Sequence, residues 1–144
     1  MTLQNPDASH CPECGSPPVD GLDCWGQLGG IIAWESGNPE LFAVHFLTVA
    51  AYNLQHPAMY HDEAIAGLRE TFIEVVDHGL SVEAIRQRVS AVYDGSRQVR
   101  RPESERRPVL RRWPMTLADV TLPGDPEGAA DRVKALAKAI RSEL

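Results

Sequence analysis

Apolar residues recur every three or four positions in five stretches of this chain, and no other feature constrains its fold as strongly. This spacing is typical of amphipathic helices. The first expected helix begins at an N-cap, Asp23, and stops at Gly37. The second begins at the N-cap Asn38, with proline at its first helical position, and stops by Pro57. The link between them is so short that the two helices are expected to form an antiparallel hairpin.

Three more helices are expected after this hairpin. One runs from Asp62 to His78 and stops at Gly79, the next begins at the Ser81 cap, and residues 125–127 open the last. Their predicted core stripes are Ile65, Leu68, Phe72 and Val75 or Val76 in the first, Val82, Ile85, Val89 and Val92 in the second, and Val133, Leu136 and Ile140 in the third.

The sequence therefore predicts an all-α bundle of about five helices in a single domain spanning residues 1–144. Two segments are expected to lie outside the helices: a zinc-knuckle-like loop at 11–24 and an irregular, arginine-rich linker or loop at 96–113. The chain after this linker is expected to be extended or turn-like, either as a short strand or as a docking segment anchored by Trp113 and Leu117.

The composition is that of a globular protein, with 43% hydrophobic and 24% charged residues. No stretch approaches the roughly 18 consecutive apolar residues of a membrane-spanning helix. The first ten residues lack the basic and apolar regions of a signal peptide. We therefore expect a cytoplasmic protein without a membrane partner.

The three cysteines are Cys11, Cys14 and Cys24, and three thiols cannot all pair as disulfides within one chain. A reducing cytoplasm would also oppose disulfides. The stretch Cys-Pro-Glu-Cys-Gly has the spacing with which two thiolates bind one zinc ion, and its glycine permits a tight turn. Two alternatives stay open: a redox dithiol, for which the usual βαβ context is absent, and simple packing, above all for Cys24.

Tetrahedral zinc needs a fourth ligand, and the predicted hairpin indicates which histidine supplies it. In an antiparallel hairpin the end of the second helix returns to the level of Cys24, and His56 lies at that end. We predict one zinc site formed by Cys11, Cys14, Cys24 and His56, with His45, His61 and His10 as substitutes in that order. The alternative is that His56 only caps its helix.

A mildly polar stripe on the second helix is formed by His45, Thr48, Tyr52 and His56. Amphipathic helices usually turn apolar residues inward. The stripe therefore either forms hydrogen bonds across the core or lines a pocket, in which His45, Thr48 and Tyr52 would be the chemical groups. Glutamates from other helices that would join such a pocket are Glu35, Glu70 and Glu74.

Seven of the fourteen basic residues lie between Arg97 and Arg112. Together with Glu103 and Glu105, they give this segment a net charge of +5. The whole chain has a net charge of −6, so the remaining residues sum to −11. The segment is either a solvated connector or an anion-binding surface. The anion-binding candidates are Arg97, Arg100, Arg101, Arg106, Arg107, Arg111 and Arg112. Aromatic residues are absent between them, which makes nucleic acid the less favoured partner.

The stretches CPECG, DCWGQLGGIIAWE, HFLTVAAYNLQHP and MTLADV together resemble a family of small bacterial proteins known only as a domain of unknown function. The resemblance covers most of residues 11–120, and it implies a helical, metal-binding bacterial protein without an assigned reaction. Its strongest matches are the three cysteines, His45, Gln55, His56 and Pro57. The family has more histidine in the third and last helices, where this chain has Thr71 and Gly128, which argues against a second, catalytic metal site.

Three functional interpretations follow. The first, which we favour, is a binding or regulatory module with a structural zinc ion bound by three cysteines and one histidine. The second is a small metalloenzyme in which three cysteines hold zinc with an open coordination position. The third is a protein that binds an anionic partner or nucleic acid through the Arg97–Arg112 segment, with affinity that falls as salt rises.

Overall fold

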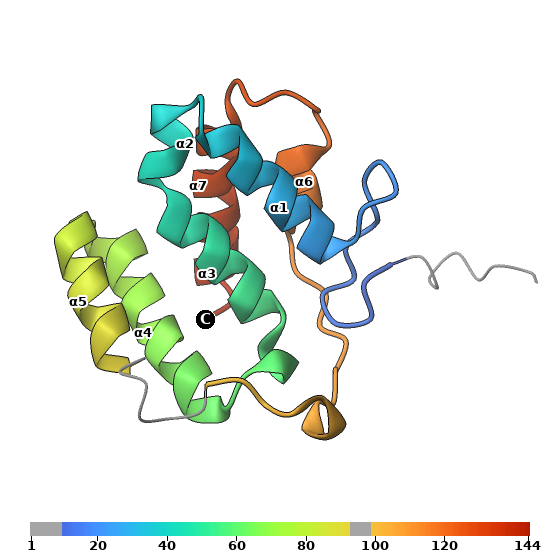
Figure 1. Ribbon diagram of the computed structural model, residues 1–144, viewed down its shortest axis with the longest axis vertical. Helices are drawn as coiled ribbons and strands as arrows, with labels where there is room; N and C mark the ends of the chain where they lie inside the picture. The colour runs from blue at the N-terminus through green and yellow to red at the C-terminus, as the bar shows by residue number, and fades with distance from the viewer. Residues whose placement is uncertain (1–9, 93–98) are drawn as a thin grey trace, which may run out of the picture.

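The computed structural model describes residues 10–92 and 99–144. Within these residues the chain is helical and has no strand (Figure 1). The α-helices are α1 (Cys24–Glu35), α2 (Pro39–Ala43), α3 (His45–Gln55), α4 (Asp62–His78), α5 (Val82–Val92), α6 (Leu117–Thr121) and α7 (Ala129–Arg141). The all-α prediction is confirmed, and the five long helices α1, α3, α4, α5 and α7 correspond to the five expected ones. No helix in the described ranges is long and apolar enough to span a bilayer.

Local chemistry sets several helix ends as the sequence predicted. The side chains of Asp23, Asn38 and Ser81 each accept a hydrogen bond from a backbone N–H in the first turn of the following helix. Helix α4 ends at Gly79, whose φ of 67° lies in the left-handed region that glycine adopts without strain.

The expected second helix is divided in two. Helix α2 ends at Ala43 and α3 begins at His45, because Val44 leaves the helical conformation with φ −106° and ψ 19°. No proline or glycine marks this break in the sequence, so the prediction of one continuous helix was wrong.

The segment expected to be extended instead contains the short helix α6. Its start is stabilised by Asp119, whose carboxylate accepts a hydrogen bond from the N–H of Thr116 at 2.9 Å. This bond belongs to a capping box, with Asp in the position where Glu is usual. Helix α7 begins at Ala129, so residues 125–127, which were expected to open this helix, precede it.

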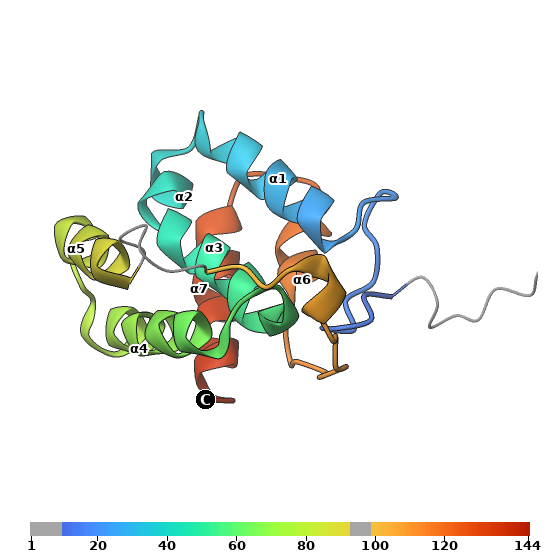
Figure 2. The same ribbon diagram turned by 60° about the horizontal axis from the view of Figure 1, so that its bottom comes forward.

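Helices α1 and α3 run in opposite directions, and α3 packs against α1, α4 and α7 (Figures 1 and 2). Helix α6 fills the space between α1 and α7, while α5 packs mainly on α4 at the edge of the bundle. The core is formed where these helices meet. Its fully buried apolar side chains include Ile31, Leu41, Phe72, Leu117, Leu136 and Ile140.

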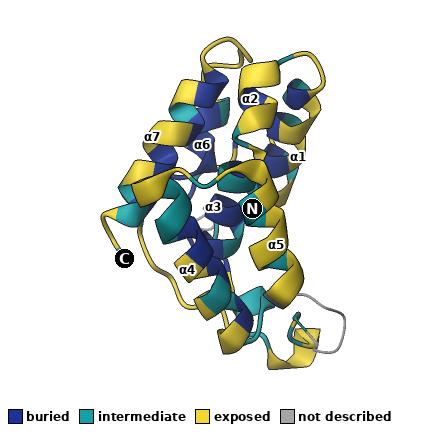
Figure 3. Ribbon diagram, turned by 90° about the vertical axis from the view of Figure 1, so that its left-hand side faces the viewer, coloured by how far each residue is buried: buried dark blue, intermediate teal, exposed yellow. Residues whose placement is uncertain are grey.

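The predicted core stripes differ in how deeply they are buried (Figure 3). On α7 the stripe of Val133, Leu136 and Ile140 is completely buried, as expected. On α5, Ile85 and Val89 are only half-buried and Val82 is exposed, because α5 contacts little besides α4, while the side chain of Val92 lies outside the described residues. On α1, Leu28 and Ile31 are buried, whereas Trp25 is exposed.

Residues 99–116, which we call the strap, cross the end of the bundle from the start of α4 to α6 (Figure 1). Near its start the strap pairs with the chain around the 3₁₀ turn η2 (Pro57–Met59): His61 N donates to Val99 O, and Arg101 N donates to Met59 O, both at 2.9 Å. A second 3₁₀ turn, η3 (Glu103–Glu105), lies within the strap.

Candidate metal centre

The knuckle, residues 11–24, and the end of α3 bring three thiols and one imidazole together. The ligand atoms of Cys11, Cys14, Cys24 and His56 all lie within 4.8 Å of one another. Cys14 Sγ and Cys24 Sγ are 3.5 Å apart, as are Cys11 Sγ and His56 Nε2. For a tetrahedral zinc ion with Zn–S bonds of about 2.3 Å, neighbouring sulfur atoms lie about 3.8 Å apart. The donor set and its spacing therefore fit a metal ion, and the structure brings together the four residues that the sequence analysis named.

The first two cysteines are positioned by a tight turn of the knuckle. Gly15 N donates to Cys11 O at 2.9 Å, and Gly15 adopts a φ of 76°. Cys14 N lies 3.5 Å from Cys11 Sγ and donates to it. An N–H directed at the sulfur stabilises a thiolate. The turn thus places the two sulfur atoms on one side of the loop, as the Cys-Pro-Glu-Cys-Gly pattern predicted.

Gln27 holds the rest of the knuckle against α1. Its side chain is almost completely buried, and its Nε2 donates to Pro17 O at 3.1 Å and to Leu22 O at 3.0 Å. These bonds fix the loop that leads into Cys24, the first residue of α1. Sequence reasoning missed Gln27, although an amide one turn after Cys24, beside the apolar stripe of α1, was the signal.

His56 is oriented by the end of α3. Its Nδ1 donates to Tyr52 O at 2.6 Å, and its ring stacks on the Tyr52 ring at a centroid distance of 4.3 Å. Donation from Nδ1 leaves the lone pair of Nε2 directed at the cysteines. His56 therefore closes the cluster, because the antiparallel course of α1 and α3 brings the end of α3 back to Cys24.

Without a metal ion, the cluster residues share protons. The hydrogen bond from Cys24 lowers the pKa of Cys14 to about 4, although burial opposes this shift. The same bond, together with burial, raises the pKa of the Cys24 thiol. Burial lowers the pKa of His56, but the hydrogen bonds to the Cys14 sulfur and to Tyr52 O outweigh it and raise the pKa to about 9. A thiolate at Cys14 thus faces an imidazolium at His56.

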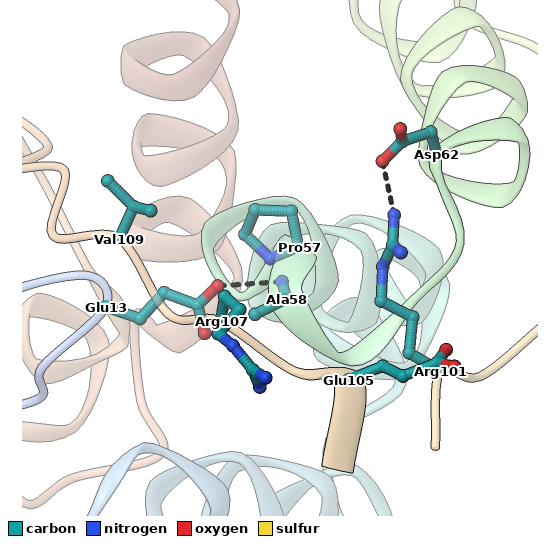
Figure 4. Close-up of a pocket in the computed structure, with 8 residues that line it drawn as sticks. All are labelled: Glu13, Pro57, Ala58, Asp62, Arg101, Glu105, Arg107 and Val109. Carbon is teal, nitrogen blue, oxygen red and sulfur yellow. Dashed lines mark hydrogen bonds and ion pairs between the residues drawn. The ribbon is translucent and has the colours of Figure 1, made fainter. Parts of the chain in front are cut away.

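Glu13 links the knuckle to its two neighbours. Its buried carboxylate accepts a hydrogen bond from Ala58 N at 2.8 Å (Figure 4). Its backbone oxygen accepts another from Arg111 N of the strap, also at 2.8 Å. Burial raises the pKa of Glu13, and the bond from Ala58 opposes that shift. Sequence reasoning did not identify Glu13, because both partners are distant in the chain.

The strap also packs on the knuckle at other points. Thr116 Oγ1 donates to Ser16 Oγ at 3.0 Å. The side chain of Leu110 approaches Gly15 so closely that a methyl group there would lie 3.6 Å from it. The strap is therefore part of the support around the metal centre.

The other histidine candidates do not join the cluster. His45 lies at the far end of α3, where its Nδ1 donates to the buried carboxylate of Glu35, with distances of 2.5 and 2.7 Å to the two oxygens. Thr48 is completely buried and donates to Val44 O at 3.4 Å. Tyr52 lies beside the metal centre. The predicted polar stripe is therefore divided along α3: Tyr52 and His56 line one cavity, whereas His45 and Thr48 lie elsewhere.

Most of the candidate arginines in the described part of the strap form bonds within the chain. Arg101 pairs with Asp62 at 2.6 Å (Figure 4), and Arg106 and Arg107 donate to backbone oxygens of the strap. Arg111 lies 3.9 Å from the centre of the Trp113 ring and donates to Glu143 O. Arg100 and Arg112 are exposed. Arg97 lies outside the described residues.

Comparison with known proteins gives one match. No curated protein and no solved structure matches this chain. A family model, described as "Family of unknown function (DUF5946)", matches residues 9–144, a range that contains all four residues of the metal centre. The resemblance to a family without an assigned activity is thereby confirmed. Because the match spans nearly the whole sequence, the chain belongs to this family of unknown function.

Proposed function

We propose that the protein is a binding or regulatory module in which a structural zinc ion holds the N-terminal knuckle to the helical bundle. One observation carries this proposal: four protein side chains, three of them buried, offer their ligand atoms within 4.8 Å of one another. Sites closed by four protein ligands are usually structural, and thiolates with an imidazole favour zinc over calcium or magnesium.

Besides its hydrogen bonds to α1, to η2 and to the strap, the knuckle has little apolar burial to hold it in place. Among its residues from Cys11 to Asp23, the only buried apolar side chains are those of Cys14 and Val19. A segment with so small a core gains little from the hydrophobic effect, so metal ligation would supply its missing stability. The zinc ion would join the knuckle to the start of α1 and the end of α3.

Replacing Cys11 and Cys14 together by serine tests this proposal. The double variant should lose its zinc and melt at a distinctly lower temperature than wild type, and a chelator should lower the wild-type melting temperature toward that of the variant. His61→Asn is the matched control, because His61 is the next histidine along the chain after His56 and is not part of the cluster. A double variant that melts like wild type, with and without chelator, would contradict the proposal.

The metalloenzyme alternative has less support. A catalytic zinc ion keeps one position for water or substrate, whereas His56 here provides a fourth protein ligand. A zinc-bound water detected in the loaded protein would favour this alternative.

A second candidate function is the binding of an anionic partner by the strap. Arg100, Arg107 and Arg112 are exposed and have no ion-pair partner among the described residues, and Val109 beside them is 76% exposed. Binding of an anionic polymer should then weaken as salt rises. The double variant R107E/R112E should bind less well, whereas the control K134E/K138E, which changes exposed lysines on α7, should not. Binding that is absent at low ionic strength would exclude this function.

A further inference from the structure

A cavity of about 550 Å³ opens directly beside the metal centre. Cys11, Cys24 and His56 line it, together with Asp23, Trp25 and Tyr52, and prolines of the knuckle complete its wall. Its volume lies within the range of small-ligand sites. The cavity is therefore large enough for a ligand of the size of an amino-acid side chain.

Two aromatic rings form one side of this cavity. Trp25 is 60% exposed, and its ring meets that of Tyr52 edge to face at 5.7 Å. Tyr52 in turn stacks on His56, so a row of rings leads from the surface to the cluster. An indole left exposed at the mouth of a cavity offers its face to a ligand.

The charges around the cavity are negative. When the cluster holds Zn²⁺, its three thiolates and neutral imidazole give the metal site a net charge of −1. The carboxylate of Asp23 also lines the cavity; its Oδ1 accepts the hydrogen bond from Gly26 N at 2.9 Å, and no bond to its Oδ2 is seen in the described residues. No lysine or arginine from the described ranges lines the cavity. The field at this site therefore attracts cations.

We propose that this cavity binds an organic cation with an apolar body, such as a quaternary ammonium or guanidinium group. The cation lies against the Trp25 ring, where the ring quadrupole attracts it, and near the carboxylate of Asp23. Its apolar body packs on the prolines and on Tyr52. This inference rests on the proposed function, because the charge of the zinc-loaded cluster contributes to the field.

The test is a titration of the zinc-loaded full chain with choline, followed by the NMR signal of the Trp25 indole N–H. The control ligand is 3,3-dimethyl-1-butanol, which has the shape of choline and no charge. Choline should saturate the site with a dissociation constant below about 10 mM, and the neutral alcohol should bind at least tenfold more weakly. No saturation by choline at this concentration, or equal binding of the alcohol, would overturn the inference.

Two variants test whether Trp25 and Asp23 bind the cation. Trp25→Leu should weaken choline binding about tenfold, and Asp23→Asn, which keeps an N-cap for α1, should weaken it severalfold. Because Trp25→Leu lacks the reporting indole, binding by wild type and all variants is also followed by the N-methyl NMR signal of choline. Phe42→Leu is the matched control, because Phe42 is an equally exposed aromatic residue outside the cavity. Unchanged choline binding by both Trp25→Leu and Asp23→Asn would contradict the assigned site.

Two further measurements on the same samples distinguish a protein partner from a small molecule as the ligand, and show whether zinc is bound. N-acetyl-trimethyllysine amide represents the side chain of a partner protein: tighter binding than choline supports a protein partner, and equal binding supports a free small molecule. The zinc content of each sample is measured first. One zinc ion per chain without choline binding removes this inference alone, whereas a chain that binds no zinc removes the proposed function.

Discussion

Protons compete with the metal ion for the side chains of the cluster. Metal binding requires thiolates and a neutral imidazole. In the metal-free protein, Cys14 is already ionised at pH 7, because its pKa is lowered to about 4. Cys24 retains its proton, since the bond to Cys14 and burial raise its pKa, and His56 is protonated, since its pKa is about 9. Metal loading at neutral pH must therefore displace protons from both Cys24 and His56.

This competition predicts how affinity depends on pH. Because the pKa of His56 is raised to about 9, the proton on its ring is present below that pH and is lost above it. The apparent affinity for zinc should rise steadily from pH 6 to pH 9. Calorimetry at pH 7 in two buffers of different ionisation enthalpy should show the release of at least two protons per ion, those of Cys24 and His56. An affinity that does not change over this interval would contradict the protonation states described above.

The fourth ligand can be tested by a pair of histidine variants. His56→Asn should weaken zinc binding by more than about a hundredfold, because even residues that only support a ligand contribute 10- to 100-fold. His61→Asn should leave the affinity unchanged, since His61 lies outside the cluster. Competition with a chromophoric chelator measures both constants. Equal affinities for the two variants would show that His56 is not a ligand.

For single residues, the sequence predicted the metal ligands but not the residues that hold the knuckle around them. The spacing of Cys11 and Cys14 and the level of His56 in the hairpin predicted which atoms meet. Glu13 and Gln27 were missed, because their partners are backbone groups whose positions depend on how the knuckle folds back.

At the level of single elements, Asn38 connects the start of α2 to a distant loop. Its Oδ1 accepts a hydrogen bond from Leu41 N at 3.1 Å, and its Nδ2 donates to Pro126 O at 2.9 Å. Asn38→Ala removes both bonds and should lower the free energy of unfolding by about 1–2 kcal/mol. Urea denaturation measures this change. Ser36→Ala, at an exposed position beside it, is the control, and equal losses for the two variants would contradict the capping role.

The ends of the helices were easier to predict from the sequence than the depth to which each helix is buried. Caps and glycine stops act locally, so the ends at Asp23, Ser81 and Gly79 could be read from the sequence. Burial depends on neighbours, and a periodic stripe does not say how many helices cover it. For this reason α5 was expected to be as deeply buried as α7, although it lies at the edge of the bundle.

At the scale of the whole molecule, the knuckle, η2 and the strap support one another. Glu13 accepts hydrogen bonds from Ala58 N after the end of α3 and from Arg111 N of the strap. The strap is also attached to α3 itself, because the buried Gln55 donates to Met115 O at 2.8 Å. The sequence predicted an irregular arginine-rich segment but not this attachment, which joins residues more than forty positions apart.

This arrangement predicts what metal removal does to the protein. The amides of Ala58 and Arg111 should exchange their hydrogens much faster after chelation, because Glu13 no longer has a fixed position. The amides of α7, whose core stripe is buried away from the knuckle, should keep their protection. Hydrogen exchange followed by NMR or mass spectrometry compares the two states. Equal acceleration along α7 would show that the metal ion supports the entire bundle instead.

Zinc K-edge X-ray absorption, on protein that carries one zinc ion per chain, tests directly whether the metal site is closed by four protein ligands. We expect three sulfur ligands at about 2.3 Å and one nitrogen ligand at about 2.0 Å, with no oxygen ligand. A spectrum with fewer sulfur ligands, or with water in the fourth position, would contradict a closed structural site formed by Cys11, Cys14, Cys24 and His56.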